Sequence, residues 1–528
     1  MILAGARALI LAVTLAAGQP PTGDWIVYGD NVEPATLNWL RATDRASRQV
    51  CRLIADSLID FDQSFQFVPR LAESYSVSPD GLTITFRLRR GVTWHDGKPC
   101  TSKDVAHTIA VMQRLDPEGA ALRATFGPMS GVTTPDDWTV VARYSEPFAG
   151  ARVGWRETLI APAHVPIDPN GASTLDRSPV GTGPFRFARW SPQQEIVLEA
   201  NAAYFNGRPR ADRYVHRIVP SIEALRAAAE AGEVDVAGLS TDWLASHPNP
   251  SPSLPFRLLV YPTSYMEMIY WNLDDASGLF KDPRVRRALT MLLDRPGYIK
   301  SVHHDVYRPT ATLIDPALWG GDPGLAPWPY DPNAAARLLD EAGVKDRDGD
   351  GLRETPAGPA SFTLLYASVT PEAREIAQIL ERAGAAAGLK IQPQGLEWSV
   401  LRTRLAARQF QAVIHRRRLE PLPDPYAYFH SSQVGTGQNL GGYRSERFDK
   451  LAEQFRATFD ARAAAGLLAQ MQSLLHEDEP CTFVAIPGAV VAVHKRLRIP
   501  DVTASGLWNW YPSLLSWWVE PAERKYTQ

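Results

Sequence analysis

The stretch Val180–Trp190, with the sequence VGTGPFRFARW, restricts the fold of this chain more than any other segment. Gly181 and Gly183 have the spacing that begins a dinucleotide-binding loop, but that motif needs a third glycine where Arg186 stands here. Pro184 biases the residue before it away from helical geometry, and the aromatic and basic residues that follow alternate as in a strand. The stretch therefore predicts a sharp crossover between structural units and not a phosphate-binding loop.

Strand and helix patterns alternate on both sides of this crossover. Every second residue of Leu82–Leu88 is apolar, which is the period of a half-buried strand. After the crossover, the sequence predicts a strand at 214–219, a helix at 222–231 and a short strand at 234–237. This rhythm predicts an α/β architecture. At 528 residues the chain is too long for a single core, so we expect two or three domains.

The N-terminus has the pattern of a secretory signal. Arg7 precedes an apolar run, Ala8–Ala17, which small residues and prolines follow. The run is shorter than the roughly 20 apolar residues of a membrane-spanning helix, and no later segment has that pattern. No cysteine that would carry a lipid anchor follows it. We therefore expect residues 1–18 to be a signal peptide and the mature protein to be soluble and periplasmic, or otherwise extracytoplasmic.

Composition argues against several classes of function. Lys+Arg number 55 and Asp+Glu 58, and the sequence has no long basic run, so we expect no nucleic-acid partner. Cys51, Cys100 and Cys481 lack the spacing of a zinc site and are too few for a disulfide framework, which favours buried structural cysteines. The motifs G-x-S-x-G, S-x-x-K and the Walker lysine are missing, so we do not expect an enzyme.

Two segments contain metal-ligating residue types. The segment DRDGDG, residues 346–351, begins like a calcium loop, but Ala357 stands where that loop needs its bidentate carboxylate. An Asp/Gly turn is therefore the favoured interpretation. His303 and His304 are adjacent, and adjacent side chains on a helix point about 100° apart, which favours a surface role over a shared metal. We expect no metal and no cofactor.

Seven motifs follow one another along the mature chain: PRLAESYSVSPDGLTITFRLRRGVTWHDGKPCTSKDV, PVGTGPFRF, NAAYFNGRPRADRYVHRIVPS, AGEVDVA, DPRVRRALTMLLDR, YDPNAAARLLDEAGVKDRDGDG and PDPYAYFHSSQ. No single motif is decisive. In this order and spacing the chain resembles the extracytoplasmic solute-binding proteins of ABC transporters, in the large class that binds peptides, nickel complexes and related solutes.

The resemblance implies an α/β fold with two lobes, the type II periplasmic-binding-protein fold, and an extra α+β domain inserted in the first lobe. Lobe I would comprise residues 24–62, 178–268 and 482–528. The inserted domain would comprise residues 63–177, and lobe II residues 269–481. VGTGPF then lies where the chain leaves the inserted domain and re-enters lobe I.

The resemblance also implies a function. A peptide or peptide-like solute would bind between the lobes, favour closure about a hinge, and be delivered by a monomeric receptor to the permease of an ABC importer in the membrane. Two alternatives stay open. The same fold would bind a non-peptide solute, such as an anionic opine, a sugar derivative or a metal chelate, or the interlobe cleft would belong to an enzyme.

Peptide binders that this chain resembles place an aspartate, after a Gly-Trp pair, against the α-amino group of the peptide, because a buried ammonium is costly unless it is paired. Counted from Phe410, the acidic position falls on Glu420 and the tryptophan position on Arg417. A count from the other side gives a proline instead of an acid. Two interpretations of Arg416–Arg418 stay open: a solvated basic turn, or a cleft-facing group that holds a carboxylate or phosphate of the ligand.

Aromatic residues supply the other candidates. Trp398 matches a family position that walls the pocket, and Tyr265, Trp39 and Asp44 lie near other pocket-lining positions. Aromatic walls with a few convergent charged groups suit an amphipathic organic ligand. The resemblance thus implies a ligand-binding set made of Trp39, Asp44, Tyr265, Trp398, Arg417 and Glu420.

Overall fold

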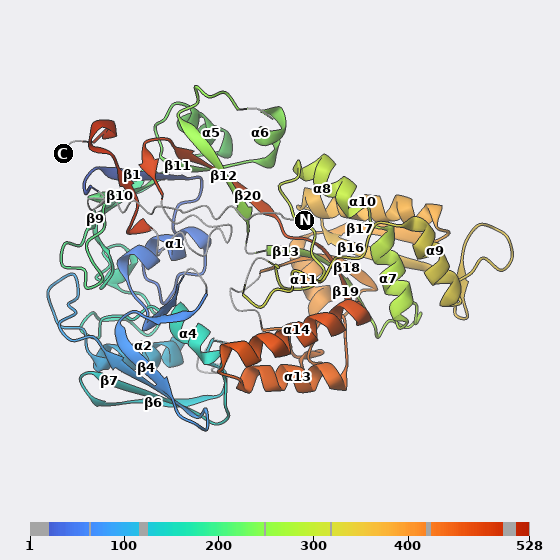
Figure 1. Ribbon diagram of the computed structural model, residues 1–528, viewed down its shortest axis with the longest axis horizontal. Helices are drawn as coiled ribbons and strands as arrows, with labels where there is room; N and C mark the ends of the chain where they lie inside the picture. Colours follow the sequence, from blue (N-terminus) through green and yellow to red (C-terminus); the bar gives the residue numbers. More distant parts are fainter. Residues whose placement is uncertain are drawn as a thin grey trace, which may run out of the picture.

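The computed structural model describes residues 21–62, 65–115, 125–247, 250–263, 265–316, 319–418, 424–499 and 514–526 (Figure 1). The predicted signal peptide, residues 1–18, lies outside these ranges. Among the helices that they contain, none combines the length and the apolar character needed to cross a membrane.

A seven-stranded sheet forms the first lobe. Its strand order is β12-β20-β11-β1-β10-β9-β8, and its members are β1 (Trp25–Asp30), β8 (Phe185–Ser191), β9 (Glu195–Ala200), β10 (Arg213–Ile218), β11 (Val236–Leu239), β12 (Phe256–Pro262) and β20 (Gly488–His494). β1 runs parallel to β10 and β11, and the other pairs are antiparallel. Successive residues of β1 enter different cores, because side chains alternate along a strand. Ile26 packs with α1 (Arg45–Ile54), and Val27 packs with α5 (Ile222–Glu230).

A five-stranded sheet forms the second lobe, with the order β17-β16-β18-β13-β19. Its strands are β13 (Tyr265–Trp271), β16 (Ser361–Ala367), β17 (Lys390–Leu396), β18 (Ala412–Arg418) and β19 (Cys481–Ala485). One face packs against α7 (Pro283–Leu292), α8 (Arg295–His303), α9 (Pro332–Glu341) and α10 (Pro371–Ala386). The other face packs against α11 (Trp398–Ala406), α13 (Glu446–Ala457) and α14 (Ala461–Asp478).

A four-stranded antiparallel sheet, in the order β4-β5-β7-β6, forms the inserted domain with α2 (Ser102–Leu115) and α4 (Ala151–Glu157). Its strands are β4 (Ala72–Val77), β5 (Thr83–Leu88), β6 (Met129–Asp136) and β7 (Thr139–Tyr144). The predicted strand at 82–88 is therefore confirmed. Phe86 and Trp155 pack in the core of this domain with ring centroids 5.1 Å apart. The sheet lies at the lower left of Figure 1, with α4 beside α13 and α14.

Short elements complete the described chain. They are β2 (Ile59–Phe61), β3 (Phe67–Pro69), α6 (Thr241–Ser246), β14 (Glu354–Thr355), β15 (Gly358–Pro359), α12 (Tyr426–Phe429), β21 (Leu497–Arg498), β22 (Trp518–Val519) and the 3-10 helices η1 (Thr174–Asp176), η2 (Ser431–Gln433) and η4 (Pro521–Glu523). All three cysteines are buried and unpaired with one another, which confirms their predicted structural character.

In the part of the chain that the structure describes, the backbone passes between the two large sheets at two places, from β12 to β13 and from β19 to β20. The two crossings are joined by a hydrogen bond, because the backbone N–H of Thr263 donates to the carbonyl of Pro487 at 2.7 Å. Sheet pairing corrects the expected limits of lobe II at residues 269 and 481. β13 and β19 pair with each other, and β13 also pairs with β18, so both strands belong wholly to the five-stranded sheet. The expected limits of the inserted domain, residues 63 and 177, stay a prediction.

The VGTGPF stretch lies against the end of α1, as a crossover requires. Gly183 donates its N–H to the Ile54 carbonyl at 2.8 Å. A Cβ atom at Gly181 would come within 1.8 Å of the Ile54 carbonyl oxygen. On its other side, Gly181 accepts from the N–H of His95, a residue of the inserted domain, at 2.8 Å. The crossover prediction is confirmed, and its physical cause is close approach of two backbones.

The inserted domain also contacts the second lobe, at the end of α13. The N–H of Ala149 donates to the carbonyl of Arg456 at 2.6 Å. The Arg456 guanidinium lies 5.4 Å from the ring centroid of Phe148, and Arg152 lies 5.3 Å from the ring centroid of Phe459. We call this group the α13 contact. It is a second link between the two sides of the molecule, remote in sequence from the crossings.

Candidate ligand-binding site

Three of the predicted ligand-binding residues lie at one end of the five-stranded sheet, with Tyr265 on the face of Arg416 and Arg418, and Trp398 and Arg417 on the opposite face. Tyr265 lies directly opposite Arg418 in the β13–β18 ladder, so Arg417 is one position away. Trp398 begins α11 directly after β17, and its ring stacks on His415 of β18 with centroids 5.8 Å apart and planes 9° apart. The side chains of Tyr265 and Trp398 are 43% and 44% exposed, which is high for large apolar residues. We call Tyr265, Trp398, His415, Arg416 and Arg417 the β18 edge; the name refers to the end of this strand, since β18 itself lies inside the sheet.

Arg416 is paired with an acid on the α8–α10 side of the sheet. Its Nη2 lies 2.8 Å from Oε1 of Glu267 and 3.9 Å from a carboxylate oxygen of Glu372. Glu267 is 3% exposed, and its other oxygen accepts from the Tyr298 hydroxyl at 2.9 Å. Burial raises the pKa of Glu267, although Arg416 and Tyr298 both favour the carboxylate. The charge of Arg416 is thus balanced within the protein.

Arg417 points to the opposite side of the same sheet, because it is the next residue of the strand. Its Nε donates to the Tyr270 hydroxyl at 2.9 Å, and its two terminal nitrogens donate to the side-chain and backbone oxygens of Gln438 at 3.1 and 3.0 Å. The guanidinium also faces the rings of Tyr270 and Tyr428, 5.4 and 5.3 Å from their centroids. All of these partners are neutral.

Arg418 is the last residue of β18, and its positive charge acts on a carboxylate of the inserted domain. It lowers the pKa of Glu157, at the end of α4, together with Arg52 and Arg156. Burial alone would raise this pKa, yet the three arginines and the hydrogen bond from Arg156 hold it at about 2. Because β18 extends to Arg418, Arg416–Arg418 form the end of a strand, and their interpretation as a solvated turn is wrong.

Trp39 and Asp44 lie in the first lobe, on the other side of the crossings from the β18 edge. Asp44 is the N-cap of α1, and its two oxygens accept from the backbone N–H and the hydroxyl of Ser47 at 2.7 and 2.5 Å. Burial opposes ionisation of Asp44, but these hydrogen bonds outweigh it and lower its pKa. Trp39 is partly buried, and its indole N–H has no hydrogen-bond partner in the described part of the chain. Glu420 lies outside the described residues.

His303 is buried, so its predicted surface role is wrong. Its ring is 3% exposed and stacks on Tyr307, with centroids 3.5 Å apart, while Tyr298 meets it edge-on at 4.7 Å. His304 takes the left-handed conformation that ends α8, with φ of 50°. The helix ends at His304, so His303 is buried while His304 is half-buried. His303, Tyr307 and Glu267 adjoin the β18 edge, and the sequence signal that marks Glu267 is one acid inside the apolar strand YMEMIYW.

Asp346, Asp348, Asp350 and Glu354 have carboxylate oxygens within 4.8 Å of one another, and Glu354 was not foreseen from the sequence. These carboxylates bind the backbone of their own loop. Asp346 accepts from the N–H groups of Gly349 and Gly351 at 2.7 and 3.0 Å. Glu354 accepts from the N–H of Arg347 at 2.9 Å. This geometry is that of an Asp/Gly turn, the interpretation that the sequence favours.

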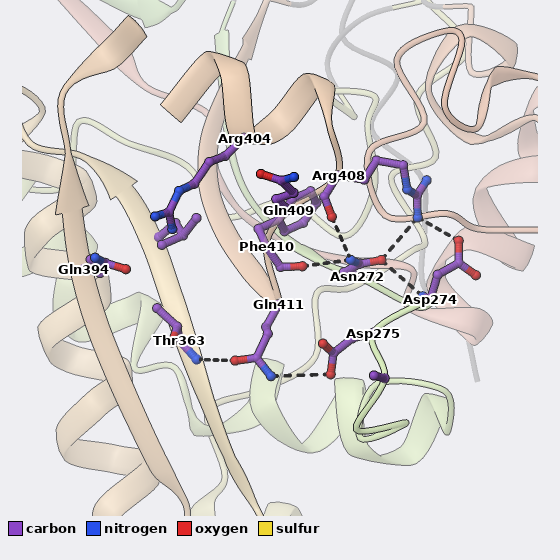
Figure 2. Close-up of a pocket in the computed structure, with 12 residues that line it drawn as sticks. Asn272, Asp274, Asp275, Thr363, Gln394, Arg404, Arg408, Gln409, Phe410 and Gln411 are labelled. Atoms are coloured by element: carbon purple, nitrogen blue, oxygen red, sulfur yellow. Dashed lines mark hydrogen bonds and ion pairs between the residues drawn. The ribbon is translucent and has the colours of Figure 1, made fainter. Parts of the chain in front are cut away.

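A polar pocket of about 410 Å³ lies at the other end of the five-stranded sheet (Figure 2). Its walls bind one another: the Asn272 side chain donates to the Phe410 carbonyl at 2.7 Å, and Arg408 donates to Asp274 at 2.8 Å. Arg404, from α11, also lines it (Figure 2). None of the five predicted ligand-binding residues that the structure describes lines this pocket, which is separated from the β18 edge by the length of β13 and β18.

Comparison with known proteins identifies one family. Residues 66–439 match the family described as bacterial extracellular solute-binding proteins, family 5 middle. The oligopeptide-binding protein AppA of Bacillus subtilis is 29% identical over 495 residues, which cover 92% of this chain and 90% of that protein. Its structure in complex with a nonapeptide has a TM-score of 0.72 at 27% identity and covers 95% of this chain and 100% of that one.

A second structure is similar in fold alone. NikA from Brucella suis in complex with Fe(III)-EDTA has a TM-score of 0.78 at 19% identity, covering 94% of this chain and 100% of that one.

Proposed function

This chain belongs to the bacterial extracellular solute-binding proteins of family 5, and we propose that it captures a peptide or peptide-like solute for an ABC importer. The fold class expected from the sequence, an α/β two-lobed type II periplasmic-binding-protein fold, is confirmed. One observation carries the proposal: the structure of AppA in complex with a nonapeptide covers 95% of this chain at 27% identity.

The two crossings supply the hinge that such a receptor needs. The chain passes between the sheets only where β12 meets β13 and β19 meets β20, within the described residues, so rotation there moves one lobe against the other. A solute that contacts both lobes makes more contacts in the closed form than in the open form. Its binding therefore favours closure, and the closed form is what the permease recognises.

The β18 edge is the proposed ligand-contacting surface of the second lobe. Tyr265 and Trp398 offer exposed rings, and Arg417 offers a charge. Trp39 is the proposed contact of the first lobe. Asp44 acts through α1, because both of its carboxylate oxygens are bound by Ser47. Glu420 remains the proposed partner of a ligand ammonium group.

We further propose that residues 1–18 act as a signal peptide and that the mature protein works as a monomer outside the cytoplasm. It has no nucleic-acid partner and does not chemically change its solute. The replacement of the family's Gly-Trp pair by Arg416 and Arg417 favours one alternative, an anionic non-peptide solute in the same site.

Thermal unfolding with and without candidate solutes tests the function. Peptides of two to nine residues are expected to stabilise the purified protein, by about 2.7 kcal/mol at 100 times Kd. Fe(III)-EDTA and an opine serve as the competing classes. Stabilisation by one of these, with no response to any peptide at millimolar concentration, would overturn the peptide proposal. Mass spectrometry of the recovered peptide distinguishes binding from hydrolysis, because a binding protein returns it intact.

A further inference from the structure

We propose that Arg417 binds a carboxylate of the solute, so that this receptor selects peptides that present an anionic group to the β18 edge. The inference rests on the proposed function and adds the charge class of the solute. It depends on a difference between neighbouring arginines that the sequence alone presents as equivalent.

The difference is one of charge balance. Arg416 lies 2.8 Å from the carboxylate of Glu267, and Arg418 interacts with Glu157. Arg417 has no carboxylate within 4.0 Å among the residues that the structure describes; its hydrogen bonds go to Tyr270 and to Gln438. A cation that is partly removed from water without a counter-ion is unfavourable, and an incoming carboxylate relieves that cost.

The donors that remain on Arg417 match this role. A guanidinium has five N–H donors, and three of them are used: Nε by Tyr270, and one on each terminal nitrogen by Gln438. One N–H therefore remains on each terminal nitrogen. Each of these N–H groups can donate to an anionic oxygen, and such charge-assisted hydrogen bonds are stronger than those to the neutral Gln438.

Arg417 is also held in place before any ligand arrives. Its three hydrogen bonds fix the plane of the guanidinium, and the rings of Tyr270 and Tyr428 lie near it. The Tyr270 hydroxyl is itself fixed, because it donates to the sulfur of Met268 at 3.4 Å while it accepts from Arg417. A preorganised side chain loses little freedom on binding, so more of the interaction appears as affinity.

Three peptides test the inference by calorimetric titration: tri-alanine, tri-alanine amide and Ala-Glu-Ala amide. The first has a terminal carboxylate, the second has none, and the third has its carboxylate on a side chain. Wild type is expected to bind at least one of the two carboxylate-bearing peptides tenfold or more tightly than tri-alanine amide. The one preferred shows whether the chain terminus or a side chain supplies the anion.

Substitution then assigns the preference to one residue. Arg417→Met is expected to bind all three peptides with similar Kd values, and Arg417→Lys to keep a reduced preference, because lysine has the charge without the fork. Arg462→Met, an exposed arginine of α14, is the matched control and should behave as wild type. Circular dichroism checks that each variant is folded.

The outcomes separate this inference from the proposed function. An unchanged carboxylate preference in folded Arg417→Met would overturn the role of Arg417. Equal binding of all three peptides by wild type would overturn the charge class while supporting the peptide receptor. If wild type binds no peptide but binds glutarate, and Arg417→Met does not, the anion site stands and the peptide function fails.

Discussion

His303 illustrates, at the scale of one residue, how burial sets the charge of a side chain. Neither ring nitrogen has a hydrogen-bond partner within the described residues, and the ring is stacked on Tyr307. Burial, with the positive charges of Arg416 and His304, lowers the pKa of His303 to about 4. In the unfolded chain the pKa returns to about 6.5. Between these values the unfolded state binds the proton and the native state does not, so acidification weakens the fold.

His303→Phe is expected to reduce this loss, because phenylalanine can stack on Tyr307 and cannot be protonated. Between pH 7 and pH 4.5, the variant should lose about 2 kcal/mol less of its free energy of unfolding than wild type loses. Urea unfolding at the two pH values measures the difference. His247→Gln, at the half-buried end of α6, is the control and should follow wild type. Parallel losses in His303→Phe and wild type would show that His303 does not titrate in this range.

For a whole element, the contact between α1 and the VGTGPF stretch shows that neighbouring backbone decides which residue types a position tolerates. Gly181 and Gly183 have ordinary negative backbone φ values, so any residue could adopt their conformation. What excludes a side chain is the carbonyl end of α1, since a Cβ on Gly181 would lie 1.8 Å from the Ile54 oxygen. Thr182, between them, donates to the buried Asp56 at 3.0 Å. The stretch therefore joins α1 to β8 through backbone contact.

Gly181→Ala is expected to destabilise the protein by about 3 kcal/mol, the upper part of the range for overpacked sites, because neither backbone can move away without breaking its hydrogen bonds. Gly131→Ala in β6 is the matched control, since a Cβ there meets nothing within 4 Å. Its effect should stay within about 0.5 kcal/mol. Chemical denaturation of both variants measures the contrast. Equal stabilities would mean that α1 and the stretch can separate freely.

Elements with a strong local pattern could be predicted from the sequence, and the pairing of distant strands could not. The expected helix at 222–231 is α5, Ile222–Glu230, and the expected strand at 214–219 is β10, Arg213–Ile218. Each follows from periodicity within its own residues. The different environments of Arg416 and Arg417 follow from the register between β13 and β18, whose residues are about 149 positions apart. No local pattern contains that register, so the three arginines could not be told apart.

At the scale of the whole molecule, two kinds of link join the lobes. The crossings are covalent and stay intact in the proposed hinge rotation, whereas the α13 contact is non-covalent and would break if the inserted domain moved away from α13. Arg456 is central to it: its carbonyl accepts from Ala149, and its guanidinium lies over the rings of Phe148 and Tyr426. The α13 contact thus favours the arrangement seen in this structure over more open ones.

Arg456→Ala is expected to shift the ligand-free protein toward open forms. A cation–π contact of this kind is worth about 0.5–1 kcal/mol, so the ratio of this arrangement to open ones should fall about two- to fivefold. Small-angle X-ray scattering should show a larger radius of gyration for the variant and convergence with wild type when solute is added. Arg462→Ala provides the control. Identical scattering of Arg456→Ala and wild type would mean that the α13 contact contributes nothing to the equilibrium.

The position of β20 has a consequence for how the protein is made. This strand comes from residues 488–494, near the end of the chain, yet it lies between β11 and β12, and Arg496 just beyond it pairs with Asp24 and Asp235. A nascent or truncated chain that lacks this strand leaves two unprotected sheet edges, which invite pairing with other chains. The first lobe is therefore completed only after residues 488–494 have been synthesised, and a stop codon before them would disrupt a sheet whose other strands lie far upstream.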